Sequence, residues 1–298
     1  MHGLERAIAI VNPWKKEAKE IAEEIRAELM AKNVVCDIYT YDGISMEDPF
    51  ESYDFAITLG GDGTVLFAAR HCARKRIPIF PVNLGEFGFI AGIQPGNWKR
   101  PLEEFLGGTR YTNSRMLLNA RVERGGESLF SADALNDAVI AGSGIAKMIR
   151  LEVLFNGTSF GAYKADGIIV STPTGSTAYS AANGGPILAP DLSAFILNPI
   201  CPFSLSNRPI VLPSSGTMKI TVLEMRHKET ILSIDGQETF PLQEGDAVFV
   251  NEAPDRARLI GCDEDVFYGA LRSKLNWSGA PVPNRAVGRD EKSGERHA

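Results

Sequence analysis

The sequence predicts an α/β N-terminal domain built on a parallel sheet, followed by a mainly β C-terminal domain. In the first third of the chain, uniformly apolar runs alternate with segments of helical periodicity, a pattern typical of a parallel sheet covered by helices. After about residue 112, apolar segments become short, and turn pairs such as Asn156-Gly157 and Asp235-Gly236 interrupt them. The 298 residues suit two domains of roughly 100–200 residues each. We expect the α/β domain to span residues 1–110 and the β domain residues 111–263.

The α/β domain is expected to begin with a strand at Ala7–Val11, whose uniformly apolar residues suit burial on both faces. Residues 15–32 follow with apolar side chains at helical spacing and Lys and Glu on the opposite face, which predicts a surface helix. The remaining expected elements are strands at residues 34–39, 55–59 and 77–82 and a helix over residues 64–73. Because ligands of parallel sheets bind beyond the carboxyl ends of the strands, the residues that follow these strands are candidates for a site.

The β domain is expected to consist of short strands. They lie at residues 116–123, 148–155, 218–223, 231–234, 247–250 and 257–260. Residues 264–275 are expected to be helical, and the segment 264–277 is expected to return to the α/β domain and complete it. From residue 278 the chain is polar and has no periodicity, so residues 278–298 are expected to form a flexible tail.

Composition argues against several classes of function. The formal net charge of −6 opposes a surface that holds polyanionic DNA or RNA. The four cysteines form no C-x-x-C pair and the four histidines show no ligand spacing, so we expect reduced thiols and no metal ion held by protein ligands. No apolar stretch approaches the ~18–20 residues that cross a bilayer, and no signal peptide is recognised. We therefore expect a cytoplasmic protein without membrane or nucleic-acid partners.

A glycine cluster, Gly60-Gly61-Asp62-Gly63-Thr64, directly follows the expected strand at residues 55–59. Glycines let the backbone approach a ligand, and free amides at a helix start favour phosphate. The cluster is neither a Walker A loop, because no Gly-Lys-Ser/Thr follows, nor a dinucleotide fingerprint, because Leu66 replaces the third glycine. Asp62 has two interpretations. It either handles a proton or hydroxyl beside bound phosphates, or caps the following helix.

This cluster resembles the Gly-Gly-Asp-Gly-Thr motif shared by NAD kinases, by the diacylglycerol and sphingosine kinases and, more loosely, by the 6-phosphofructokinases. The motif alone implies phosphoryl transfer to a hydroxyl. Three further segments, residues 83–90, 135–137 and 166–180, are similar to NAD kinases specifically, and residues 199–209 follow as in that family. The resemblance covers about residues 7–275 and implies the two-domain NAD kinase architecture.

The resemblance implies an enzyme that transfers the γ-phosphoryl group of ATP to the 2′-hydroxyl of the adenosine ribose of NAD, with Asp62 as the general base. It further implies Mg²⁺ or another divalent cation bound with ATP, and a homodimer or homotetramer. The implied nucleotide-binding residues are Gly60, Gly61, Gly63, Thr64, Phe87, Asn136, Asp137, Lys147, Lys164, Asp166, Thr174, Thr177, Ala178, Tyr179, Ser180, Ala181, Ala182 and Gln237.

The residues themselves leave other interpretations open. Asn136-Asp137 offers an amide and a carboxylate suited to base or ribose groups, but the pair could equally form a turn with local side-chain bonds. The hydroxyl-rich loop at residues 171–180 could surround an adenine or nicotinamide, or be an ordinary Ser/Thr turn with Tyr179 in the core. A lipid or sugar kinase with the same glycine cluster and a non-catalytic NAD(P) sensor remain the alternative functions.

Overall fold

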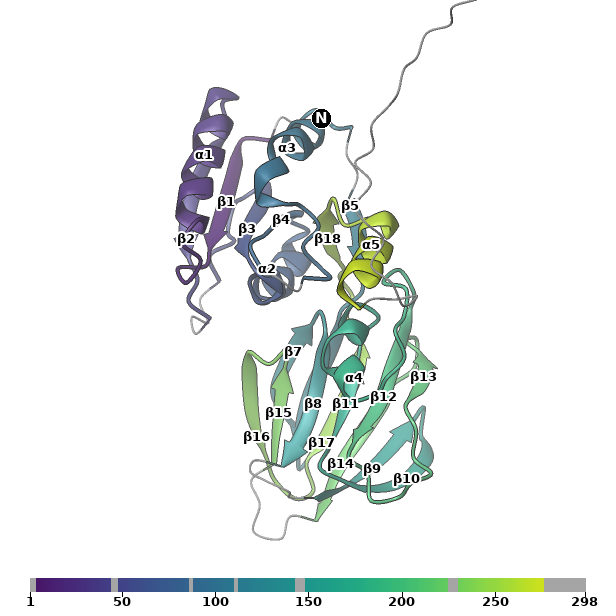
Figure 1. The fold of residues 1–298 in the computed structure, drawn as a ribbon. Coiled ribbons are helices and arrows are strands. Elements are labelled where there is room, and N and C mark those ends of the chain that lie inside the picture. Colours follow the sequence, from purple (N-terminus) through teal and green to yellow (C-terminus); the bar gives the residue numbers. More distant parts are fainter. Residues whose placement is uncertain are drawn as a thin grey trace, which may run out of the picture.

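The computed structural model describes residues 4–43, 48–85, 88–109, 112–142, 148–224 and 230–275. It confirms an N-terminal α/β domain on a largely parallel sheet and a C-terminal antiparallel β domain (Figure 1). The expected tail at residues 278–298 lies outside the described residues.

The sheet of the α/β domain has the order β2-β1-β3-β4-β18-β5. Its strands are β1 (Arg6–Val11), β2 (Val35–Thr40), β3 (Phe55–Gly60), β4 (Ile79–Asn83), β5 (Thr112–Arg115) and β18 (Ala257–Ile260). All neighbours are parallel except β5, which pairs antiparallel with β18. The sequence assigned residues 257–260 to the β domain, but the structure places them beside β4. Periodicity reveals a strand and its buried face, not the sheet it joins.

Helices cover both faces of this sheet. They are α1 (Ala18–Ala31), α2 (Asp62–Lys75), α3 (Lys99–Leu106) and α5 (Glu264–Lys274), with a 3₁₀ turn, η1 (Pro95–Asn97). Ala7 and Ala9 of β1 pack with α1 and α3, whereas Ile8 and Ile10 pack with α2. The predicted burial of β1 on both faces is therefore confirmed.

The β domain is a sandwich of two antiparallel sheets, ordered β10-β9-β14-β17-β6-β7 and β13-β12-β11-β8-β15-β16. The first sheet contains β6 (Leu118–Arg124), β7 (Glu127–Ala134), β9 (Ile149–Phe155), β10 (Thr158–Ala165), β14 (Met218–Glu224) and β17 (Ala247–Glu252). The second contains β8 (Asp137–Gly142), β11 (Gly167–Ser171), β12 (Ala194–Ile200), β13 (Ile210–Pro213), β15 (Thr230–Ile234) and β16 (Glu238–Leu242). Alternate apolar side chains of both sheets form one shared core. Between β11 and β12 lie a 3₁₀ turn, η2 (Thr174–Thr177), and the short helix α4 (Tyr179–Ala182).

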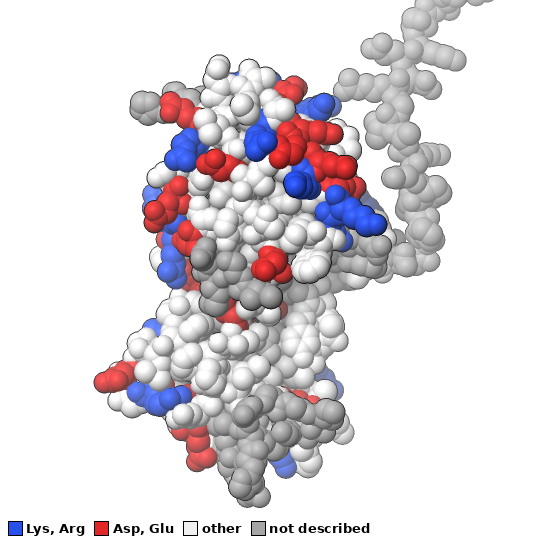
Figure 2. All heavy atoms as spheres, turned by 90° about the vertical axis from the view of Figure 1, so that its left-hand side faces the viewer, with Lys and Arg blue, Asp and Glu red and all other residues white. Residues whose placement is uncertain are grey.

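Charged side chains of both signs are interspersed on the face shown in Figure 2. Within the described residues, no helix has both the length and the apolar character needed to cross a membrane.

Candidate active site

The glycine cluster forms a tight turn in which β3 ends at Gly60 and α2 begins at Asp62, two residues earlier than the sequence predicts. A Cβ atom on Gly60 would lie 2.2 Å from Thr64 Oγ1, so no other residue fits there without displacing Thr64. At Gly61 a Cβ would meet nothing within 4 Å, which leaves the outer side of the turn open. The turn thus presents the backbone of a helix start without bulky side chains in front of it, as a phosphate site requires.

The carboxylate of Asp62 does not cap α2. The N-cap position is held by Gly61 and no side chain bonds to the helix start. Asp62 Oδ2 instead accepts a hydrogen bond from the Phe89 amide at 3.1 Å, and Oδ1 is buried without a hydrogen-bond partner. A Cβ on Gly88 would lie 2.9 Å from that Oδ1, so glycine at position 88 leaves the space it occupies. The capping interpretation is therefore wrong.

Burial raises the pKa of Asp62, and the backbone amides of residues 89–91 and the Lys274 ammonium oppose that rise. A carboxylate with one bonded oxygen and one unpartnered buried oxygen has an acceptor ready for a proton from a ligand hydroxyl. The arrangement suits general-base chemistry at the end of a phosphate-binding turn.

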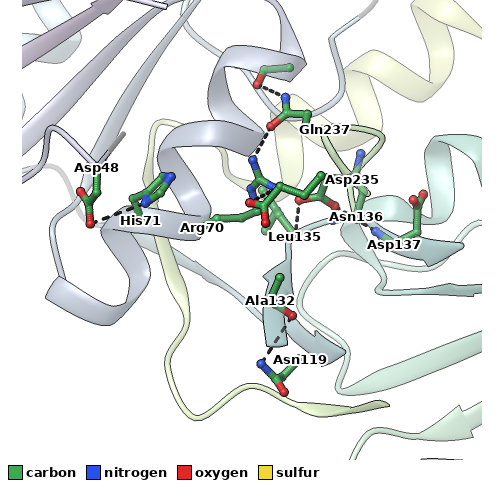
Figure 3. A network of polar contacts seen from close by, with 12 residues as sticks. Asp48, Arg70, His71, Asn119, Ala132, Leu135, Asn136, Asp137, Asp235 and Gln237 are labelled. Atoms are coloured by element: carbon green, nitrogen blue, oxygen red, sulfur yellow. Dashed lines mark hydrogen bonds and ion pairs between the residues drawn. The ribbon is translucent and has the colours of Figure 1, made fainter. Parts of the chain in front are cut away.

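A second constellation lies where β7 passes into β8. The Asp235 carboxylate accepts hydrogen bonds from the amides of Leu135, Asn136 and Asp137 at 3.0, 2.8 and 3.1 Å. The side-chain Oδ1 of Asn136 takes no part in these bonds and is buried without a hydrogen-bond partner. Figure 3 shows Asp235 between Arg70 and the Asn136-Asp137 pair. From its sequence context Asp235 is expected only to form a turn, and no local pattern indicates this role.

Asp137 and Asp235 are two buried carboxylates close enough to interact. Burial raises the pKa of Asp137 to about 7, and the negative charge of Asp235 acts in the same direction. Burial also raises the pKa of Asp235, to about 6, but the Arg70 guanidinium and the three amides oppose this rise. Asp235 is therefore the carboxylate that stays ionised, and Asp137 is the one that titrates near neutral pH.

A pocket of about 420 Å³ opens directly beside these residues. It brings together four residues that the sequence predicted for the site, namely Asn136, Asp137, Ala178 and Tyr179. Tyr179 is 46% exposed, so the interpretation that places it in the core is wrong. The pocket also has apolar walls, including Val139 and Ile231, which suit the flat face of an adenine or nicotinamide ring.

Most hydroxyls of the loop at residues 171–180 bond to the loop's own backbone or its neighbours. Ser171 and Thr172 bond to carbonyls of residues 135, 136 and 172, and Ser176 bonds to the carbonyls of residues 173 and 188. Thr177 donates to the Thr174 carbonyl, and the buried Oγ1 of Thr174 has no partner. The loop is thus largely held by its own hydrogen bonds, with Thr174 Oγ1 still available to a ligand.

Gln237 connects the two constellations. Its Nε2 donates to the Gly63 carbonyl at 2.7 Å, and its Oε1 accepts from Arg70 Nη2 at 2.8 Å. Arg70 Nη1 also lies 2.8 Å from Glu238 Oε1. The amide of Gln237, expected to contact nucleotide, is therefore already bonded within the protein and fastens the glycine turn to the turn that carries Asp235.

The structure does not bring every expected residue into the pocket. Lys164 is exposed, with its Nζ 4.7 Å from the ring centroid of Phe203. The residues expected from the β domain that do not line the pocket are Lys164, Asp166, Thr174, Thr177, Ser180, Ala181, Ala182 and Gln237. Phe87 and Lys147 lie outside the described residues.

Two family models match the chain. The ATP-NAD kinase N-terminal domain matches residues 47–110, and the ATP-NAD kinase C-terminal domain matches residues 135–262. An NAD kinase of Treponema denticola is 55% identical over 281 residues, which cover 94% of this chain and 99% of that protein. The chain belongs to the NAD kinase family. An NAD kinase of Treponema pallidum is 47% identical over 287 residues, covering 96% of this chain and 94% of that protein.

Solved structures of the NAD kinase family share the fold. A yeast NADH kinase in complex with NADH superposes with a TM-score of 0.83 at 22% identity, covering 95% of this chain and 91% of the other. An NAD kinase from Archaeoglobus fulgidus in complex with ATP gives a TM-score of 0.71 at 25% identity, covering 90% and 98%. The predicted family and fold class are confirmed, and the lipid-kinase, sugar-kinase and sensor alternatives are not favoured.

Proposed function

We propose that this member of the NAD kinase family transfers the γ-phosphoryl group of ATP to the 2′-hydroxyl of the adenosine ribose of NAD, giving NADP and ADP, with Asp62 as the general base. The observation that carries the assignment is the buried, unpartnered Oδ1 of Asp62 beside the open turn of Gly60–Thr64. An oxygen with that environment accepts a proton without first giving up another hydrogen bond.

In the proposed step, Asp62 takes the proton of the 2′-hydroxyl as its oxygen attacks the γ-phosphorus. The bond from the γ-phosphorus to the β,γ-bridging oxygen breaks, and its electron pair leaves on ADP. Backbone amides at the start of α2 stabilise the charge on the phosphoryl oxygens. Because such transfers depend mostly on positioning, Asp62 should account for about 10²–10⁴-fold of the rate and not for all of it.

We assign the acceptor to the pocket of Asn136, Asp137 and Tyr179. The free Oδ1 of Asn136 can accept from a nucleoside, and Asp137 can accept from two adjacent ribose hydroxyls. Thr174 offers a further hydroxyl from the neighbouring loop. Asp235 and Gln237 have a different role. Asp235 holds the backbone beside this pocket, and Gln237 holds the glycine turn at a fixed position relative to it.

A divalent cation, Mg²⁺ in our proposal, enters as part of the donor substrate and is held by the triphosphate oxygens. Among the residues that the structure describes, no group of three or more His, Cys, Asp and Glu side chains is placed to hold a metal ion. A Cβ on Gly61 would meet nothing within 4 Å, so no neighbouring side chain crowds the turn on that side. The cation would neutralise charge on the β- and γ-phosphates.

We further propose a cytoplasmic homodimer or homotetramer. The edge strand β13 carries exposed apolar side chains, including Val211 at 45% exposure, and Phe203 and Leu205 nearby in sequence are 69% and 87% exposed. Apolar side chains at an open sheet edge favour contact with another copy. Light scattering after gel filtration measures the assembly directly.

The decisive experiment incubates the purified chain with NAD, ATP and Mg²⁺ and measures NADP with an NADP-specific dehydrogenase. Asp62→Asn serves as the matched variant. Formation of NADP by the wild type and its loss in the variant supports the proposal. If diacylglycerol or a sugar is phosphorylated instead of NAD, or NAD binds without turnover, the assignment is wrong.

A further inference from the structure

Helix α5 ends against the segment that holds Asp62. Lys274 is the last residue of this helix, and its Nζ donates a hydrogen bond to the Gly88 carbonyl. The same ammonium lies 5.6 Å from the ring centroid of Phe89. The amide of Phe89 in turn donates to Asp62 Oδ2 at 3.1 Å. The ammonium of Lys274 is thus bonded to the backbone segment whose next amide, that of Phe89, holds Asp62, the candidate base.

The charge of Lys274 acts directly on this carboxylate. Burial lowers the pKa of Lys274 while the Asp62 carboxylate raises it, and the ammonium in turn lowers the pKa of Asp62. Among the described residues, Cys262 is a further titratable group that interacts with Asp62, and its thiol donates to the Ile90 carbonyl at 2.9 Å. Burial raises the pKa of Cys262 to about 11, so the thiol is neutral. Among the groups that act on Asp62 within the described structure, Lys274 therefore supplies positive charge.

We propose that Lys274 is a positioning residue for phosphoryl transfer: its ammonium holds the segment at residues 88–91 against Asp62 and keeps the buried carboxylate ionised between turnovers. The inference rests on the proposed role of Asp62 as the base. A buried carboxylate tends to retain a proton, and a base that has taken the proton of the 2′-hydroxyl must release it before the next cycle. A nearby cation favours that release because it attracts only the ionised form.

Three substitutions separate the charge of Lys274 from its hydrogen bond. Lys274→Arg keeps both, Lys274→Gln keeps a donor for the Gly88 carbonyl without charge, and Lys274→Met keeps neither. Arg272→Met removes a positive charge from an exposed position on the same helix and serves as the matched control.

The measurement is the pH profile of kcat/KM for NAD between pH 5 and 9, together with melting temperatures. We expect the acidic limb to move upward by about one pH unit in Lys274→Gln and Lys274→Met, which is a loss of roughly tenfold at a fixed pH on that limb. In Lys274→Arg and Arg272→Met the acidic limb of the profile should stay at the wild-type pH. A merely structural role would lower the melting temperature and leave the limb in place.

A titration of Asp62 by ¹³C NMR, in the wild type and in Lys274→Gln without substrates, gives a readout that does not depend on turnover. An unchanged carboxyl pKa, or an unmoved acidic limb in both neutral variants, overturns the inference about Lys274 and leaves the proposed function standing. Normal turnover by Asp62→Asn overturns the proposed base instead, and the NMR titration still decides the electrostatic role of Lys274.

Discussion

Arg70 Nη2 donates to Gln237 Oε1 at 2.8 Å, and this bond joins the two domains at the candidate site (Figure 3). Arg70 lies on α2, the helix that begins at the glycine turn, and Gln237 lies between β15 and β16. Because Gln237 also donates to the Gly63 carbonyl, the turn proposed to hold donor phosphates is fixed against the pocket proposed to hold the acceptor. In-line transfer requires such fixed distances between two bound substrates.

Asp62→Asn should lower kcat by about 10²-fold or more while NAD and ATP still bind. Asparagine keeps an oxygen acceptor for the Phe89 amide, but it cannot take a proton from a hydroxyl. The melting temperature should stay close to that of the wild type, because Asp62 does not cap α2. Steady-state kinetics and calorimetry check this, and near-normal turnover would contradict it.

Gly88→Ala should reduce kcat by roughly tenfold, since a Cβ at this position lies 2.9 Å from Asp62 Oδ1 and must displace it. Gly96→Ala is the control, because a Cβ there meets nothing within 4 Å. Equal kcat values for the two alanine variants would show that the carboxylate tolerates displacement.

Gln237→Ala removes two hydrogen bonds between the domains and should lower the free energy of unfolding by about 1–2 kcal/mol. We also expect kcat to fall more than substrate affinity. Both binding surfaces remain, but their positions relative to each other are held less firmly. Thr239→Ala, on an exposed position of β16, controls for the substitution itself. Urea unfolding and a kcat-against-KM comparison test the prediction, and loss of affinity alone would assign Gln237 to ligand contact.

Asp137→Asn should change how stability depends on pH. Burial raises the pKa of Asp137 from 3.8 to about 7, so the folded protein binds a proton that the unfolded chain has released between about pH 4 and pH 7. The contribution of Asp137 to the free energy of unfolding of the wild type therefore falls as the pH rises from about 4 to about 7. It stays low above pH 7. The variant should melt at a higher temperature than the wild type at pH 8 and at nearly the same temperature at pH 4. A constant difference across that range would contradict the assignment.

Asp137→Ala should weaken NAD binding by about 1.5–3 kcal/mol, because a carboxylate proposed to accept from ribose hydroxyls is lost. The affinity for ATP should change little, since the glycine turn lies on the other domain. Titration calorimetry with each nucleotide measures both values. Normal NAD affinity would limit Asp137 to a structural role.

The sequence predicts much of this fold because periodicity reports which faces of an element are buried. Strands such as Ala7–Val11 and the glycine turn after residue 59 lie where that reasoning puts them. Asp235 and Lys274 were missed for a physical reason. Asp235 lies 98–100 residues from the amides it binds, and Lys274 lies 186 residues from Gly88. Neither contact leaves a local pattern in the chain.

The hydrogen bonds of Asp62 likewise cannot be predicted from its neighbours in the sequence. A carboxylate at a helix start usually indicates a cap, but here the bonding group is the Phe89 amide, 27 residues away. Only the folded backbone reveals that Gly61 occupies the cap position and that Oδ1 is left without a partner. Conversely, the sequence predicts Asn136, Asp137 and Tyr179 as nucleotide-binding residues, and the structure brings all three to one pocket, while their role in binding stays a prediction.

The position of β18 has a consequence for synthesis on the ribosome. Residues 257–260 fill the place beside β4, so β4 is an open sheet edge until almost the whole described chain has emerged. During that time Ile79, Phe80 and Val82, which are fully buried in the finished protein, lack their final cover. Nascent chains released early would expose this edge to one another and aggregate. The β domain, whose core is built from its own residues, is thus translated while the N-terminal sheet still lacks β18, and the α/β domain is completed only after the β domain has been made.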